Sequence, residues 1–229
     1  MPRRKIPILL AIALIAALTA NATDFWLTKD WKQWSRVDCE NLLAESPWAH
    51  TWRGGGPAGD QLAFAVQLRS SLPIRQAIVR QLQLDQKYDK MTDAQRGTFD
   101  AQAAQILNRT YDDTILVHMD FSKGSVADRL GADLHAYVQK GIEHLDAFLI
   151  TDDETKLTPT RFDMNPKAPG TFDLVFPRLV NGAPAIKDGQ KHFSVQFQSP
   201  QLIGPDVPSR RIRVDFDLSK MAVNGKLSY

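Results

Sequence analysis

Apolar and polar residues alternate in several stretches of the chain, and this period of two predicts β-strands. The alternation is clear at residues 61–69, 113–121, 192–198 and 211–218. After residue 145, short stretches of this kind are separated by Pro, Gly and Asn turns. This spacing favours an antiparallel β-sandwich of immunoglobulin-like type in the last part of the chain.

Helical periodicity fills much of the sequence between the first two of these strands. Residues 70–71 are a serine pair that could cap a helix, with Pro73 in its first turn. Thr92 and Gln95 have the spacing of a capping box at the start of a second helix. We expect these two helices to lie antiparallel, and a third helix is predicted at 125–140. Together with the strands, they place the chain in the α+β class.

These patterns divide the chain into four parts: a signal peptide at 1–22, a Trp-rich helical arm with a Gly linker at 23–56, an α/β region at 57–142, and a β-sandwich-like region at 143–229. The strand at 113–121 could belong to either of the last two parts. The composition is ordinary and contains no low-complexity run, so we expect the parts after the signal to be folded.

The first 22 residues have the features of an export signal. A basic start is followed by an apolar run at 6–20, which is shorter than the ~20 residues needed to span a bilayer. Ala20-Asn21-Ala22 is an A-x-A cleavage site. We therefore expect cleavage after Ala22, a periplasmic or extracellular location, and no transmembrane span in the mature protein. The alternative is an uncleaved N-terminal anchor.

Charge and cysteine usage narrow the possible functions. Removal of the basic signal leaves acidic and basic residues nearly balanced, and no basic arm indicates a nucleic-acid partner. Cys39 is the only cysteine, which excludes a disulfide within the chain and a cysteine-based zinc site. We expect Cys39 to be buried, although it could in principle pair with His50 as a nucleophile and base. No cofactor is expected.

Tryptophan is confined to one segment, residues 24–52, which contains Trp26, Trp31, Trp34, Trp48 and Trp52. Within it, Ser35 and Asp38 have the spacing of a capping box. One interpretation is that the indoles form a satellite core that docks the arm onto the rest of the protein. The other is that Trp48 and Trp52 form an exposed platform for a partner protein, a glycan or a membrane interface.

His118 and Asp120 are the first candidate site for chemistry, because they lie two residues apart on one face of a predicted strand. With His135 or His144 they could supply two nitrogens and one oxygen to a metal ion. The alternative is that they are the polar face of a half-covered strand.

Two further candidates concern ions. Arg75, with Arg69 and Arg80, could bind an anion near the N-terminus of the first long helix. The acidic turn 152–154, with Asp146 nearby, could hold calcium through oxygen ligands. The sequence contains no nucleophile elbow, phosphate-binding loop or dinucleotide-binding motif.

Several features together resemble a group of uncharacterised exported proteins from environmental bacteria. They are the signal peptide, the WxxW and SPWA motifs, the arginine-bearing helix after the serine pair, and the ending FDLSKMAVNGKLSY. The resemblance implies export and brings no catalytic motif.

We therefore predict a non-enzymatic binding or structural module of the bacterial envelope, with an envelope protein or a glycan as partner. One alternative is a metal-assisted hydrolase that uses His118 and Asp120. The other is a carbohydrate-binding module that uses exposed Trp48 and Trp52.

Overall fold

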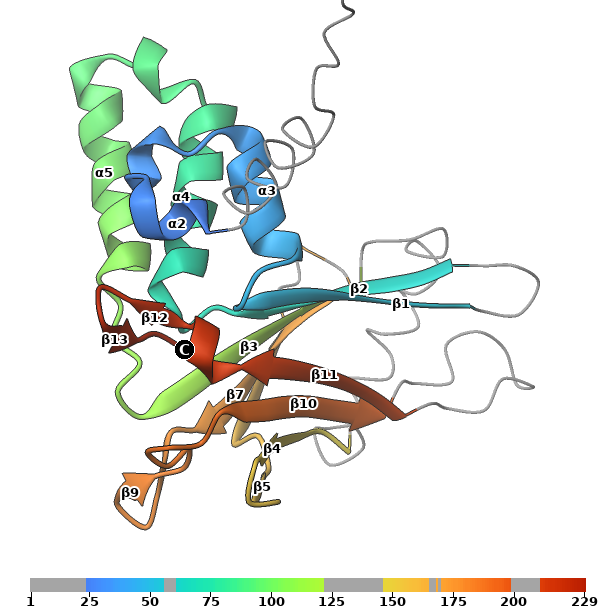
Figure 1. Ribbon diagram of the computed structural model, residues 1–229. Helices are drawn as coiled ribbons and strands as arrows, with labels where there is room; N and C mark the ends of the chain where they lie inside the picture. Colours follow the sequence, from blue (N-terminus) through green and yellow to red (C-terminus); the bar gives the residue numbers. More distant parts are fainter. Residues whose placement is uncertain (1–23, 56–60, 122–145, 165–167, 169, 199–210) are drawn as a thin grey trace, which may run out of the picture.

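A computed structural model of the chain describes residues 24–55, 61–121, 146–164, 168, 170–198 and 211–229 (Figure 1). The helices lie together on one side, and the strands form two main antiparallel sheets beneath them. The predicted α+β class is confirmed at this level. No helix among the described residues is long and apolar enough to cross a membrane.

The helices begin where local sequence signals place them. Both predicted capping boxes are present, Ser35 with Asp38 and Thr92 with Gln95. The two long helices α4 and α5 pack against each other as expected, and α3 packs on α4. The helical elements are α2 (Phe25–Thr28), η1 (Trp31–Gln33), α3 (Arg36–Ala44), α4 (Leu72–Asp85), η3 (Tyr88–Lys90), α5 (Asp93–Leu107) and η5 (Leu218–Lys220).

The larger sheet has five strands, in the order β1 (Ala49–Gly55), β2 (Gln61–Leu68), β3 (Thr114–Asp120), β7 (Thr171–Pro177) and β6 (Arg161–Met164). The smaller sheet has four, in the order β11 (Arg211–Asp217), β10 (His192–Gln198), β4 (Phe148–Thr151) and β5 (Lys156–Leu157). Two short hairpins complete the described strands: β8 (Leu179–Val180) with β9 (Ala183–Pro184), and β12 (Ala222–Val223) with β13 (Lys226–Leu227).

The five-stranded sheet joins strands from both sides of the boundary predicted at residue 143. Strand β3 pairs with β2 on one side and, along seven residues, with β7 on the other. The stretch at 113–121, which the sequence could not assign, is therefore the middle strand of this sheet. Long-range pairing of this kind depends on register between distant segments, which the local pattern does not contain.

Two glycines of the predicted linker are part of a strand. Gly54 and Gly55 continue strand β1 and pair with Leu62 and Gln61 of β2. A Cβ at Gly54 would collide with the indole of Trp52. Glycine at this position is therefore explained by the close approach of an aromatic ring rather than by flexibility.

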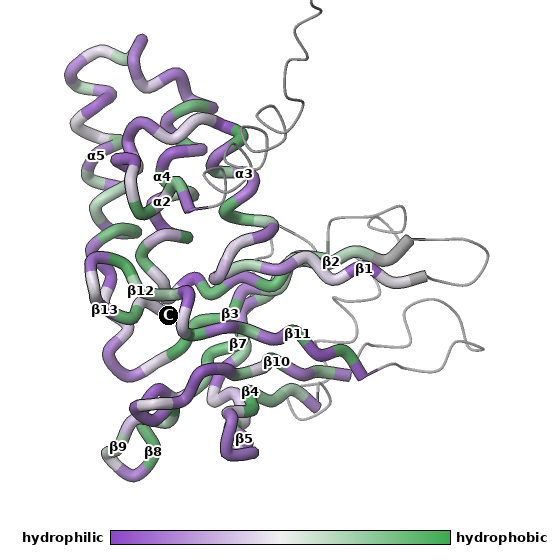
Figure 2. Tube along the Cα trace, in the orientation of Figure 1, coloured by the Kyte–Doolittle hydropathy of each residue, from purple (hydrophilic) through white to green (hydrophobic). Residues whose placement is uncertain are grey.

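The apolar faces of the two sheets meet in one main core. The ring of Phe64 on β2 lies 4.6 Å from that of Phe121 and 5.9 Å from that of Phe197 on β10. Hydrophobic stretches of the strands run through this region (Figure 2). The alternative interpretation of His118 and Asp120 as the polar face of a half-covered strand fails for His118, because all residues from Ile115 to Met119 are buried.

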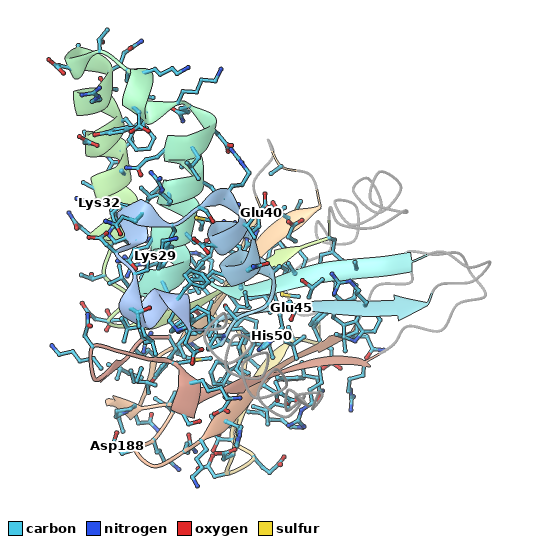
Figure 3. All side chains as sticks on the ribbon, turned by 45° about the horizontal axis from the view of Figure 1, so that its top comes forward. Lys29, Lys32, Glu40, Glu45, His50 and Asp188 are labelled. Atoms are coloured by element: carbon cyan, nitrogen blue, oxygen red, sulfur yellow. The ribbon has the colours of Figure 1, made fainter. Side chains whose placement is uncertain are left out.

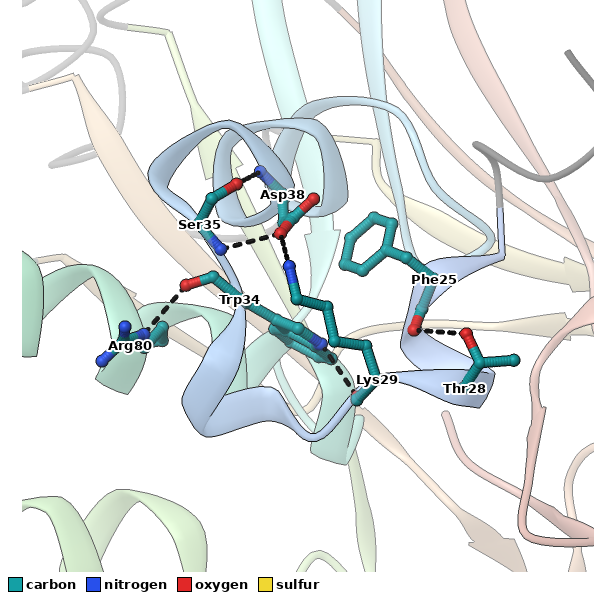
Figure 4. A network of polar contacts seen from close by, with 7 residues as sticks. All are labelled: Phe25, Thr28, Lys29, Trp34, Ser35, Asp38 and Arg80. Carbon is teal, nitrogen blue, oxygen red and sulfur yellow. Dashed lines mark hydrogen bonds and ion pairs between the residues drawn. The ribbon is translucent and has the colours of Figure 1, made fainter. Parts of the chain in front are cut away.

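The tryptophan arm belongs to the same core. The side chains of Trp34 and Trp48 are almost completely buried, and both indole N–H groups donate hydrogen bonds, to the carbonyls of Lys29 and Ser228. Around Trp34, Lys29 also forms an ion pair with Asp38 at 2.6 Å (Figure 4). The docked arm predicted from the tryptophan pattern is what the structure contains.

Candidate functional site

A cleft of about 980 Å³ lies between the arm and strand β11. Helix α2, the end of α3, strand β1, the start of β10, the end of β11 and η5 all contribute to its walls. Its apolar lining includes Phe25, Trp26, Leu27 and Phe216, and its polar lining includes Asp24, Asn41, Glu45, His50, His192, Asp215, Asp217, Ser219 and Lys220. Its size is within the range of small-molecule and peptide sites.

The lining carries excess negative charge. Four carboxylates face one ammonium group, and that group, on Lys220, lies 3.4 Å from the Asp217 carboxylate. Burial lowers the pKa of His50, and the carboxylate of Glu45, 3.8 Å away, opposes this shift only in part. His50 is therefore neutral at pH 7 (both side chains are labelled in Figure 3). Such a lining disfavours phosphates and other anions.

One wall of the cleft is the outer edge of a sheet. Among the described strands, β11 pairs with β10 only, and the N–H of Leu218, just after β11, donates to the Lys191 carbonyl at 2.7 Å. Backbone groups of successive strand residues point to opposite sides. The groups of Phe216 therefore point toward β10, and those of Asp215 and Asp217 point toward the open edge. Within the described residues, no strand pairs with this edge.

The opposite wall also ends in an outer strand, β1, but its edge is covered. Ser46 and Ala49 exchange backbone hydrogen bonds of 2.8 and 3.2 Å. The N–H of Thr51 donates to the Glu45 carboxylate at 3.2 Å, and the Thr51 hydroxyl donates to the Ala44 carbonyl at 3.1 Å. The end of α3 and the residues after it thus satisfy the outward N–H groups of Ala49 and Thr51, in the first half of β1.

The tryptophans proposed as an exposed platform lie elsewhere. Trp48 is fully buried, so the prediction that it offers a face to a ligand is wrong. Trp52 is half-buried, and its ring stacks on Phe64 at 4.7 Å between centroids. The tryptophan of the arm that does line the cleft is Trp26, which the sequence gave no reason to prefer.

Arg75 is used inside the protein rather than for anion binding. Its guanidinium donates to the carbonyls of Ile106, Leu107 and Arg109 at 3.1, 2.6 and 2.9 Å, where helix α5 ends. Arg80 donates to the Trp34 carbonyl at 2.9 Å. The predicted anion site at the start of α4 is therefore wrong, because the cation caps carbonyls at the end of another helix.

The partner of His118 is a residue that sequence reasoning missed. His118 and Asp173 are directly opposite in the β3–β7 register, and Nδ1 lies 2.6 Å from the carboxylate. Burial lowers the pKa of His118, and the hydrogen bond to Asp173 opposes that shift. Asp120 lies two residues further along β3, on the same face of the strand. The described residues contain no group of three metal-ligating side chains, and His135 and His144 lie outside them.

The acidic turn at 152–154 is also occupied by protein contacts. Asp152 accepts hydrogen bonds from the backbone N–H groups of Lys191 and His192, at 2.6 and 2.9 Å. Asp153 forms an ion pair with Lys187. These carboxylates connect the β4–β5 hairpin to the residues before and at the start of β10. The acidic turn therefore has a structural role that does not require calcium.

Cys39 is buried, as expected. Burial raises the pKa of its thiol to about 11, so the thiolate is scarce at neutral pH. His50 is directed to Glu45 and to the ring of Phe216 at 5.1 Å. A nucleophilic pair of Cys39 and His50 is not supported.

Comparisons with known proteins find a structural similarity and no activity. No family model matches the sequence, and no curated protein matches it. The chain is similar to the crystal structure of a protein of unknown function from Burkholderia pseudomallei, with a TM-score of 0.43 and 15% sequence identity. The similarity covers 93% of this chain and 92% of that chain.

Proposed function

We propose that this protein is a non-enzymatic binding module of the bacterial envelope that receives an extended segment of a partner protein along the open edge of β11. The observation that carries the proposal is that this edge lines a cleft of about 980 Å³. The export signal at 1–22 motivates the location in the envelope.

Strand addition suits the geometry of this wall. An extended peptide that pairs with a sheet edge gains affinity from main-chain hydrogen bonds and specificity from alternate side chains. The N–H and C=O groups of Asp215 and Asp217 point toward such a peptide, by the alternation that the Leu218 to Lys191 bond fixes. Their carboxylates favour cationic side chains at every second position of the ligand.

The test uses a short synthetic peptide that alternates arginine with valine, labelled for fluorescence anisotropy. We expect it to bind the wild-type protein and to lose binding to Asp215→Pro, which removes an outward N–H. Asp215→Asn is the matched control, since it removes the charge and keeps the N–H, and it should weaken binding only several-fold. A peptide with N-methylated amides at alternate residues should not bind.

Two results would contradict the proposal. One is equal binding of the peptide to wild type and Asp215→Pro, which would place it away from the backbone edge. The other is the absence of binding at low ionic strength, where charge attraction is strongest, by protein that is monomeric at the concentration of the assay.

Trp26 favours a second candidate function, carbohydrate binding. Its partly exposed indole lines the cleft beside Asn41 and several carboxylates, a mixture that could hold the apolar face and the hydroxyls of a neutral sugar. Titration with neutral cell-wall oligosaccharides, for wild type and Trp26→Ala, tests this function. Unchanged tryptophan fluorescence across the panel would exclude it.

A further inference from the structure

The side chains of β11 that face away from the core form a charge pattern that is complementary to itself. Along the strand, Arg211 and Arg213 occupy the first half, and Asp215 and Asp217 occupy the second. All four project from the face of the sheet opposite the core, whereas Ile212, Val214 and Phe216 are buried. Reversing the direction of the strand about Val214 therefore exchanges every arginine position with an aspartate position.

We propose that the partner strand is β11 of a second copy of this chain, paired antiparallel about a two-fold axis at Val214. This inference rests on the proposed function, because it names the occupant of the edge that the function requires. In this register Arg213 lies opposite Asp215 of the second copy, and Arg211 lies opposite Asp217. The interface is isologous, as most homodimer interfaces are.

The backbone supports the same register. Alternate residues of β11 direct their backbone N–H and C=O groups away from β10. These residues are Arg211, Arg213, Asp215 and Asp217. The residues that carry the complementary charges are thus also the residues whose backbone groups can pair across the axis. The two four-stranded sheets would become one continuous sheet through both copies.

Other arrangements of the two strands are disfavoured by charge. A parallel pair in register places Arg213 beside Arg213 of the second copy and Asp215 beside Asp215. Antiparallel pairs centred on Arg213 or on Asp215 place like charges on the axis itself. Like charges directly opposite each other on a sheet are destabilising, so the pattern selects one register.

The surroundings of the edge agree with this partner. The end of β11 lines the acidic cleft, so antiparallel pairing brings the arginines of the second copy to the carboxylates of Asp215 and Asp217. Within one chain, Arg213 lies 2.7 Å from Asp215, with both side chains more than half exposed. An exposed pair of this kind is weak and can be exchanged for contacts across the interface.

The test compares charge reversals on the two halves of the strand, with mass in solution measured by sedimentation equilibrium. We expect wild type to dimerise. Arg213→Glu and Asp215→Arg, each alone, should weaken self-association by about tenfold or more, because each creates two symmetry-related like-charge contacts. An equimolar mixture of the two variants should restore dimers that contain one copy of each. The ion pair within one chain cannot explain that recovery.

Arg161→Glu is the matched control. It breaks an Arg–Asp pair of the same kind, Arg161 with Asp163 at 2.8 Å, on the outer strand β6. We expect it to leave the dimer intact. Dissociation by Arg161→Glu instead of Arg213→Glu would move the interface to β6 and overturn the proposal, as would a wild-type protein that stays monomeric at its highest soluble concentration.

The outcome also separates this inference from the proposed function. A monomeric wild type that binds the arginine–valine peptide would overturn the second copy as partner and retain the edge as a binding site. A monomeric wild type that binds no peptide would overturn both. A dimer that the mixture of charge variants does not restore would place self-association at another surface.

Discussion

The two outer strands that border the cleft are treated differently by the fold. Strand β1 has its edge covered by the residues after α3, through the Ser46 and Ala49 bonds and the Glu45 carboxylate on the Thr51 N–H. Strand β11 has charged side chains along its length and, within the described residues, no strand on its outer side. An exposed sheet edge is a hazard for aggregation unless it is covered or controlled.

The difference between the edges of β1 and β11 indicates a structural role for the tryptophan arm. The two buried indoles of the arm, Trp34 and Trp48, pack in the main core and hold α3 and the following turn against the larger sheet. The edge of β1 is thereby covered at Ala49 and Thr51. The edge of β11 carries charged side chains instead, and in our proposal these restrict pairing to strands with the complementary pattern.

The largest effect should come from releasing the cover of β1. Trp48→Ala removes a fully buried indole and its hydrogen bond to Ser228. We expect a loss of about 3–5 kcal/mol in the free energy of unfolding, measured in urea. Trp26→Ala is the control: this indole is partly exposed and meets Trp48 edge-on at 5.8 Å, so its loss should be clearly smaller. Equal losses would mean that the arm is not anchored through Trp48.

A proline placed in each edge compares the two strands directly. Thr51→Pro removes the N–H that donates to Glu45 and the hydroxyl that donates to Ala44, and should cost about 2 kcal/mol. Asp215→Pro removes an N–H that points to the open edge and an exposed ion pair, and should cost less than about 1 kcal/mol. Thermal unfolding of dilute protein measures both. A larger loss at Asp215 would show that the edge of β11 is already satisfied within the chain.

Local signals in the sequence were sufficient for most elements. The capping boxes at Ser35 and Thr92 begin helices as predicted, because a cap depends on residues three apart. Alternation located β2, β3, β10 and β11 to within a residue or two, because one face of each strand is apolar. The docked arm was one of the two interpretations that the concentration of indoles allowed, and the burial of Trp48 decides between them.

The site itself could not be predicted, because it depends on which distant segments become neighbours. Nothing near His118 indicates that Asp173 lies opposite it, since that contact is set by the register of β3 with β7. Arg75 is adjacent to a helix start in sequence, but the carbonyls that it binds belong to residues 106–109. The cleft combines residues of seven elements, and only the order of strands shows which edge borders it.

The pH dependence of the free energy of unfolding tests how well the fold excludes water from two histidines, His50 and His118. Burial lowers the pKa of His50, beside the cleft, and of His118, in the larger sheet. The unfolded chain then binds protons first, so stability should be fully present above about pH 6.5 and fall as the pH decreases through that value. Urea unfolding at neutral and mildly acidic pH measures this. His118→Gln and His50→Gln should each flatten the dependence, and an unchanged slope in both would contradict it.

The smallest perturbation is a chemical label on Cys39, which lies in the helix that covers β1. Burial raises the pKa of this thiol to about 11, so its thiolate at neutral pH should be about a hundredfold scarcer than in an ordinary cysteine. Reaction with a thiol reagent then reports opening of the arm. We expect Trp48→Ala to accelerate labelling and Asp215→Pro to leave it unchanged, because only the first loosens the cover. Equal acceleration in both variants would mean that the two edges open together, and the contrast between a closed and an open edge would fail.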